Sequence, residues 1–124
     1  MEESGYTIDV EGKIIIETFC GIFNLTNYER LKSDEFADPR FSHDFNVLSD
    51  IRMTNSKFNN EDAKRLVNFL YKNIPKTGNR KCAVVTKTPQ QVVFSVFFEE
   101  YSKILPVEVM TFSTVEAAMD WINH

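Results

Sequence analysis

The polar residues best placed for chemistry follow a run of apolar residues in the middle of the chain. This run, Phe45–Arg52, ends in Asp50 and Arg52, at the point where a buried strand is expected to give way to a loop. Ligands of α/β proteins commonly bind at that edge of the sheet. Asp50 and Arg52 could therefore contact a ligand. The simpler interpretation is that Asp50 accepts hydrogen bonds from loop amides while Arg52 pairs with a nearby acid.

The loop after Arg52 offers a possible phosphate site. Its polar residues are Thr54, Asn55 and Ser56. They precede an expected helix, whose N-terminal amides and dipole would favour an anion or a phosphate carried by Ser56 or Thr54. Thr86, after the next strand, invites the same interpretation. The alternative at each position is simple capping of the helix that follows.

The remaining reactive residues do not form a recognisable catalytic or metal-binding pattern. His43 lies in a loop and has no serine or cysteine in a recognised local arrangement. Cys20 and Cys82 are far apart in the sequence, and each falls in an expected strand, where a free cysteine acts as a small buried hydrophobe. We therefore expect no enzyme, no cofactor and no metal site.

The segment from Pro89 to about Ser102 is expected to be a helix with two apolar stripes. The first consists of Val92, Val93, Val96 and Phe97, and the second, beside it, of Phe94, Phe98 and Tyr101. A helix that is apolar around most of its circumference needs two surfaces to pack against. The second stripe is thus expected to be covered by the chain itself, by a second copy in a dimer, or by a ligand for which it forms a pocket wall.

Strands and helices alternate along the chain and position these residues. Apolar and polar residues alternate from Tyr6 to Val10, and the run Lys13–Cys20 is largely apolar. Together they predict a hairpin whose second strand is covered on both faces. Helices are expected to begin at Thr26, Asn59 or Asn60, Thr88 and Ser113. This order predicts one α/β domain over residues 1–124. Its sheet would be mostly parallel, with about five strands, an antiparallel N-terminal strand and about four flanking helices.

Composition excludes two classes of partner. The formal net charge is -4 and the basic residues are scattered, so no basic face is available for nucleic acid. The longest nearly apolar run, Val92–Phe98, is too short to span a membrane. The acidic start of the chain does not resemble a secretion signal, and we expect a cytoplasmic location.

The whole layout resembles the STAS domains, and in particular the SpoIIAA-like family of small stand-alone bacterial proteins. Asn46–Arg52 is similar to the family's hydrophobic strand that ends in Asp-Leu, and Phe112–Ile122 to its terminal segment, in which an alanine pair leads to a tryptophan. Anti-sigma factor antagonists of this group carry Asp-Ser-Ser-Gly, with a phosphorylated serine, at the start of the following helix. This chain has Asn55–Glu61 there instead, with Ser56 as its only serine.

The resemblance implies a non-enzymatic domain that acts through protein–protein interaction, in a regulatory role and with association into a homodimer. Two alternatives remain open. One is a carrier or sensor of a small apolar or lipid-like ligand, by analogy with the CRAL-TRIO group of similar fold. The other is a phosphoswitch of the anti-sigma factor antagonist type at Ser56 or Thr54.

Overall fold

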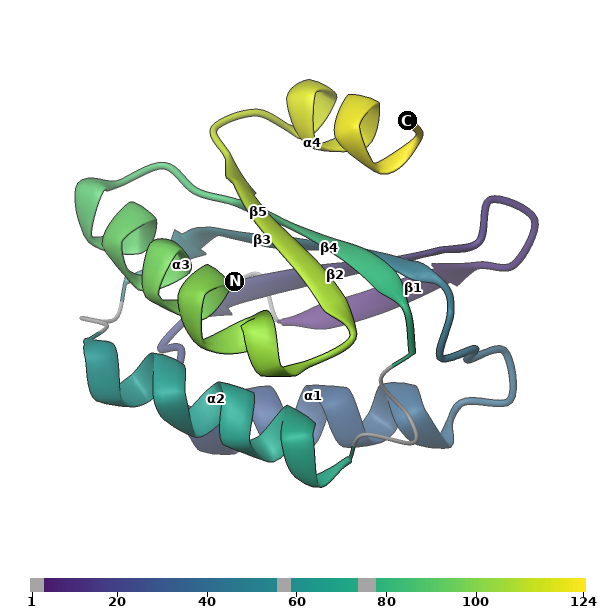
Figure 1. The fold of residues 1–124 in the computed structure, drawn as a ribbon, viewed down its shortest axis with the longest axis horizontal. Coiled ribbons are helices and arrows are strands. Elements are labelled where there is room, and N and C mark those ends of the chain that lie inside the picture. The colour runs from purple at the N-terminus through teal and green to yellow at the C-terminus, as the bar shows by residue number, and fades with distance from the viewer. Residues whose placement is uncertain (1–3, 56–58, 74–77) are drawn as a thin grey trace.

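The computed structural model describes residues 4–55, 59–73 and 78–124 and places them in three layers (Figure 1). The middle layer is a sheet of β1 (Gly5–Asp9), β2 (Ile14–Gly21), β3 (Asn46–Thr54), β4 (Arg80–Val85) and β5 (Val107–Phe112). Helices α1 (Leu25–Ala37), α2 (Asn60–Lys72) and α3 (Pro89–Tyr101) cover one face, and α4 (Val115–Ile122) covers the other. A single 3-10 turn, Ser102–Ile104, follows α3.

The strands lie side by side in the order in which they occur along the chain, from β1 to β5. β1 is antiparallel to β2, whereas β2, β3, β4 and β5 are mutually parallel. The mostly parallel α/β sheet with an antiparallel N-terminal strand is therefore confirmed. No helix among the described residues is long and apolar enough to cross a membrane.

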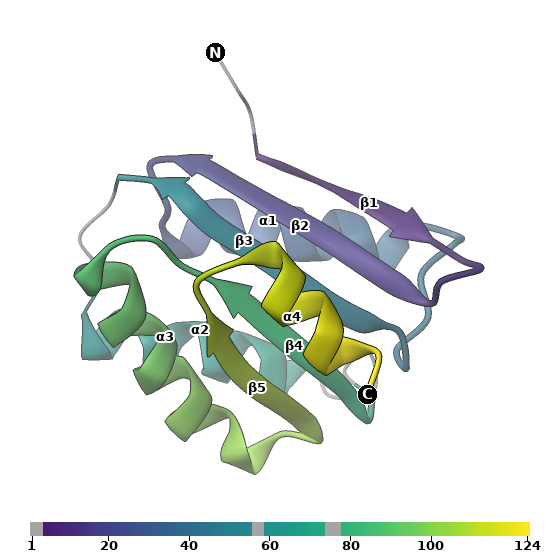
Figure 2. The ribbon, with the colours of Figure 1, turned by 90° about the horizontal axis from the view of Figure 1, so that it is seen from above.

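The core has two parts, one on each face of the sheet. The larger part fills the space under α1, α2 and α3, and the smaller part joins α4 to the sheet through residues such as Leu48, Ala83 and Ile122. The short helix α4 lies over β3, β4 and β5 and leaves much of β2 uncovered on that side (Figure 2). As a result Ile16 is 37% exposed, and the prediction that both faces of this strand are covered is wrong at that position.

Two of the predicted helix starts are confirmed, and two are displaced. Asn59 and Thr88 each cap a helix through a reciprocal capping box. α1, however, begins after Asn24 rather than Thr26, and α4 after Thr114 rather than Ser113. Asn24 and Thr114 have the extended backbone that a cap requires, and their side chains accept from the amide three residues on.

The two apolar stripes of α3 differ in how far they are covered, and of the first stripe only Phe97 packs against the core. The covered face carries Phe94 and Phe98, which are 2% and 6% exposed in the larger core. Val92, Val93 and Val96 face outward and are 41%, 52% and 52% exposed. The large rings fill the space between α3, α2 and the sheet, and the helix turns the smaller valines toward solvent.

Candidate functional site

Asp50 and Arg52 lie one strand pleat apart on β3 and bind each other. The Arg52 guanidinium donates to both carboxylate oxygens of Asp50, with N···O distances of 2.9 and 2.8 Å, and the Arg52 amide donates a third bond of 3.0 Å. Burial alone would raise the pKa of Asp50, but the hydrogen bonds from Arg52 outweigh burial and hold that pKa below its usual range. The two residues therefore satisfy each other without a ligand.

The threonines expected at the phosphate edge are buried. The hydroxyl of Thr54, which is 9% exposed, donates to the Ile51 carbonyl at 2.7 Å. Thr86 is 2% exposed, and its amide donates to the Phe112 carbonyl at 2.9 Å. Neither hydroxyl faces an open phosphate site in this conformation. Asn55 is exposed, and Ser56 lies outside the described residues.

Gln91 joins the ends of β3 and α3. Its carboxamide oxygen accepts from the amides of Lys87 and Thr88 at 2.7 and 3.1 Å. Its Nε2 atom donates to the Thr54 carbonyl at 3.2 Å. The capping box predicted from Thr88 is thus part of a buried contact that fixes the start of α3 against the end of β3.

The aromatic residues of α3 have separate environments. Phe94 and Phe98 line the larger core, whereas Tyr101 is half-buried and its hydroxyl donates to Asn60 Oδ1. Tyr101 also borders a surface groove of about 540 Å³ between α2 and α3, together with Ile104 and charged side chains of α2. In this structure Phe94 and Phe98 offer no surface to a partner.

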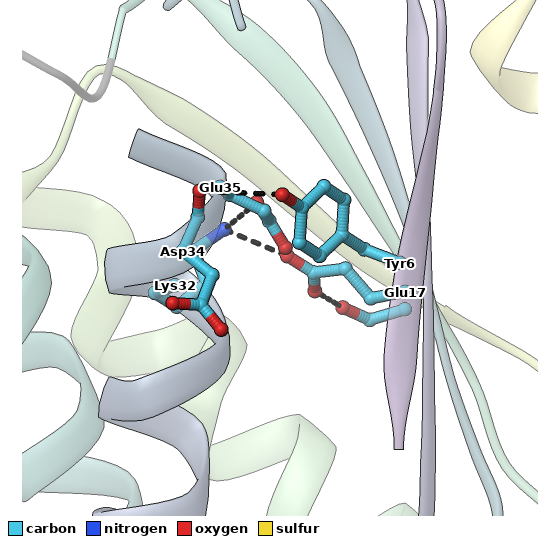
Figure 3. Close-up of polar contacts among 6 residues, drawn as sticks. Tyr6, Glu17, Lys32, Asp34 and Glu35 are labelled. Atoms are coloured by element: carbon cyan, nitrogen blue, oxygen red, sulfur yellow. Dashed lines mark hydrogen bonds and ion pairs between the residues drawn. The ribbon is translucent and has the colours of Figure 1, made fainter. Parts of the chain in front are cut away.

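A buried cluster of charged residues lies under α1 (Figure 3). It consists of Glu17 on β2, Ser49 on β3, and Lys32 and Glu35 on α1, all less than 10% exposed. The Lys32 ammonium donates to Glu17 at 2.8 Å and to Glu35 at 3.1 Å, and the Ser49 hydroxyl donates to the second oxygen of Glu17. In Figure 3 the ammonium lies between the two carboxyl groups and ties α1 to the sheet.

The charges of this cluster differ between its two acids. Burial alone would raise the pKa of Glu17, but the charge of Lys32 and the hydrogen bonds to the Glu17 carboxylate together outweigh burial and lower that pKa to about 2. The pKa of Glu35 rises to about 9, first through burial and then through the neighbouring charge of Glu17. At neutral pH, Glu17 is therefore a carboxylate and Glu35 a neutral acid, with Lys32 as the cation between them.

A second buried cation lies near this cluster, on β4. Arg80 is 8% exposed, and its guanidinium lies 5.9 Å from the centre of the Phe41 ring. Among the described residues, the Nε and Nη1 atoms of Arg80 have no hydrogen-bond partner, and neither has the hydroxyl of Ser102. Arg80, Ser102, Glu17 and Lys32 all contribute to the wall of an internal cavity of about 30 Å³.

A solved structure is similar to this chain over nearly its whole length. It is the crystal structure of an uncharacterized protein of the DUF3478 family from Shewanella loihica PV-4, described as having a SpoIIAA-like fold. That chain is 16% identical, and the alignment covers 98% of this chain and 97% of that chain with a TM-score of 0.60. This chain has a SpoIIAA-like fold. No protein-family model and no curated protein sequence matches it.

The SpoIIAA-like fold confirms the expected architecture. A similar fold does not identify functional residues, so the candidate site rests on the contacts described above. Sequence reasoning missed the buried cluster completely, although one signal was present. Glu17 is the single charged residue in the run from Ile14 to Phe19, which is apolar except for Glu17 and Thr18, and charged residues are rarely buried without a partner. Among the described residues, no group of three His, Cys, Asp or Glu side chains is placed to hold a metal ion.

Proposed function

We propose that this chain is a non-enzymatic binding domain that associates with a second copy of itself through the outward face of α3. The observation that carries this proposal is the exposure of Val92, Val93 and Val96. Val96 lies one helical turn from both other valines, so the three side chains form one continuous apolar surface. Contiguous apolar surfaces of this kind are typical of interaction sites in soluble proteins.

The chemistry of the surface favours a second copy as the occupant. Residues 89–98 contain no charged side chain, although the whole chain has a formal net charge of -4. A two-fold dimer brings the same patch of each subunit together, so a patch without charge meets no like-charge repulsion. The sequence pointed to the stripe of Phe94, Phe98 and Tyr101 as the dimer interface. We place the proposed interface on the exposed valines instead. A regulatory role and a cytoplasmic location remain predictions from the sequence.

The geometry gives less support to the other functions. The internal cavity of about 30 Å³ is far below the roughly 300 Å³ that a drug-sized or lipid-like ligand needs. The groove beside Tyr101 is large enough at about 540 Å³, but charged side chains make up half of its lining, which does not suit an apolar ligand. A phosphoswitch at Thr54 would require a buried hydroxyl to reach a kinase. Asp50 and Arg52, the polar pair at the strand end, bind each other, so neither side chain is directed at a substrate in this structure.

The test is the oligomeric state of a charged variant of the valine face. We expect the wild-type protein to dimerise with increasing concentration in sedimentation velocity, and the double variant Val93→Glu/Val96→Glu to remain monomeric. Glutamate is a good helix former, so the variant should keep its fold. Two glutamates facing their copies across a two-fold axis would repel each other.

The matched control is Val10→Glu, because Val10 is also 52% exposed but lies in the turn between β1 and β2. This variant should dimerise like the wild-type protein. A wild-type protein that stays monomeric at every attainable concentration would refute self-association. Equal weakening of the dimer by both variants would refute the assignment of the interface to α3.

A further inference from the structure

The internal cavity under α1, α2 and α3 contains hydrogen-bond donors without partners. The Nε and Nη1 atoms of Arg80 carry N–H groups that contact no acceptor among the described residues. The hydroxyl of Ser102, which is 1% exposed, is also unpaired within that part of the chain. Buried polar groups in native proteins are nearly always hydrogen-bonded, so these donors point to a guest that accepts hydrogen bonds.

The charge of the cavity wall favours an anion as this guest. The wall contains two cationic side chains, Arg80 and Lys32, and one acidic side chain, Glu17. Lys32 and Glu17 form an ion pair of 2.8 Å. Glu35 beside them is a neutral acid, so among the described residues no carboxylate pairs with Arg80. An uncompensated charge buried among apolar side chains is strongly unfavourable, and a monovalent anion would neutralise it.

The size of the cavity restricts that anion. A volume of about 30 Å³ holds one or two atoms of the size of a water oxygen. All the side chains of the wall except Val107 and Val109 are buried, so a bound ion would be enclosed by the protein. Chloride and bromide are single atoms and fit this limit, whereas sulfate, phosphate and organic acids are too large.

We propose that this cavity is an internal binding site for one halide-sized monovalent anion, held by the guanidinium of Arg80 and the hydroxyl of Ser102. The site is independent of the proposed self-association, because it lies on the covered side of α3. Its anion acts as a buried counter-ion that links β4 to the segment after α3. Binding to the folded protein alone would make stability depend on halide concentration.

The first experiment locates the ion directly. Crystals grown in sodium bromide should give a bromine anomalous peak in the cavity, in contact with Arg80. The same peak should be absent from crystals of Arg80→Met. Methionine is apolar and of similar length, so it removes the charge and fills most of the space of the arginine side chain. An ordered water, with no anomalous signal at high bromide concentration, would overturn the proposal.

The second experiment measures the effect in solution. Thermal unfolding is followed in sodium chloride or bromide against sodium gluconate at equal ionic strength, because gluconate is too large for the cavity. The wild-type midpoint should rise with halide concentration, and that dependence should be lost in Arg80→Met and weakened in Ser102→Ala. Arg30→Met, at an exposed position on α1, should keep the wild-type dependence. Equal halide dependence of the unfolding midpoint in Arg80→Met and wild type would refute the anion site. This result would not bear on the proposed dimer, which is tested separately by sedimentation.

Discussion

Replacing Glu35 by glutamine should change how the stability of this protein depends on pH. The pKa of Glu35 is raised from 4.5 to about 9 in the folded protein, through burial and the adjacent charge of Glu17. The folded protein therefore keeps a proton on Glu35 that the unfolded chain releases above pH 4.5. Stability contributed by this proton is complete below pH 4.5 and decreases as the pH rises toward 9.

The size of this effect follows from the width of that pH window. While the folded state holds one proton that the unfolded state has lost, each pH unit lowers the free energy of unfolding by about 1.4 kcal/mol. Between pH 5 and pH 7 the wild-type protein should thus lose about 2 to 3 kcal/mol through Glu35. Glu17 contributes no slope there, because its lowered pKa acts only below pH 4.5.

The assay is urea unfolding at several pH values from 5 to 8. The Glu35→Gln amide has the shape of the protonated acid, can accept from Lys32 and cannot ionise. We expect the variant to match the wild-type protein near pH 5 and to exceed its stability by about 2 to 3 kcal/mol at pH 7. Glu29→Gln, on the same helix but partly exposed, should keep the wild-type slope. Parallel pH dependence of Glu35→Gln and wild type would refute the assignment of the proton.

Three further substitutions test the contacts that hold the sheet edge and the cluster. Lys32→Met should lower the free energy of unfolding, measured in urea, by about 3 to 5 kcal/mol, because it leaves Glu17 buried without its cation. Adding Glu17→Gln to this variant should restore part of the loss. Gln91→Ala should cost about 1 to 3 kcal/mol in the same assay, since the buried Thr54 carbonyl loses a donor. Asp50→Asn should change stability by less than about 1 kcal/mol, because its partner side chain is 37% exposed, and a loss of several kcal/mol would contradict this assignment.

The succession of strands and helices along the chain and the pairing of the first two strands could be predicted because each local signal agrees with the fold. The alternation from Tyr6 to Val10 and the apolar run to Cys20 indicate a hairpin, and β1 and β2 form it. The capping boxes at Asn59 and Thr88 mark helix starts that depend on two residues three positions apart. Such signals are local, so they do not require knowledge of distant contacts.

The faces of α3 could not be predicted for a different reason. Both stripes are apolar, so the helical period alone does not say which one is covered. The choice depends on the volume available between α2 and the sheet, where the stacked rings of Phe94 and Phe98 lie 6.2 Å apart. That volume is set by residues far away in the sequence. The outward orientation of Val93 and Val96 is therefore a tertiary result.

The buried charges were missed because pairing across elements has no local pattern. Glu17 meets Lys32 over a separation of 15 residues, and Ser49 over 32. The spacing of Lys32 and Glu35 is that of an ordinary surface ion pair on a helix. Only their position on the same side of α1 as Tyr28 and Leu31 indicates burial, and charged side chains at such positions are commonly assumed to reach solvent.

The polar core under α1 divides into two parts that should respond to different perturbations. Lys32 balances the charge of Glu17 while Glu35 keeps its proton, so the charges of that part are balanced without a bound ion and the part responds to pH. The guanidinium of Arg80 has unpaired donors, so the stability that it contributes should depend on halide concentration. Glu35→Gln is therefore expected to remove the pH slope and keep the halide dependence, whereas Arg80→Met should do the reverse. If either variant abolished both responses, the two parts would be one coupled network, and the separate treatment of their charges would be wrong.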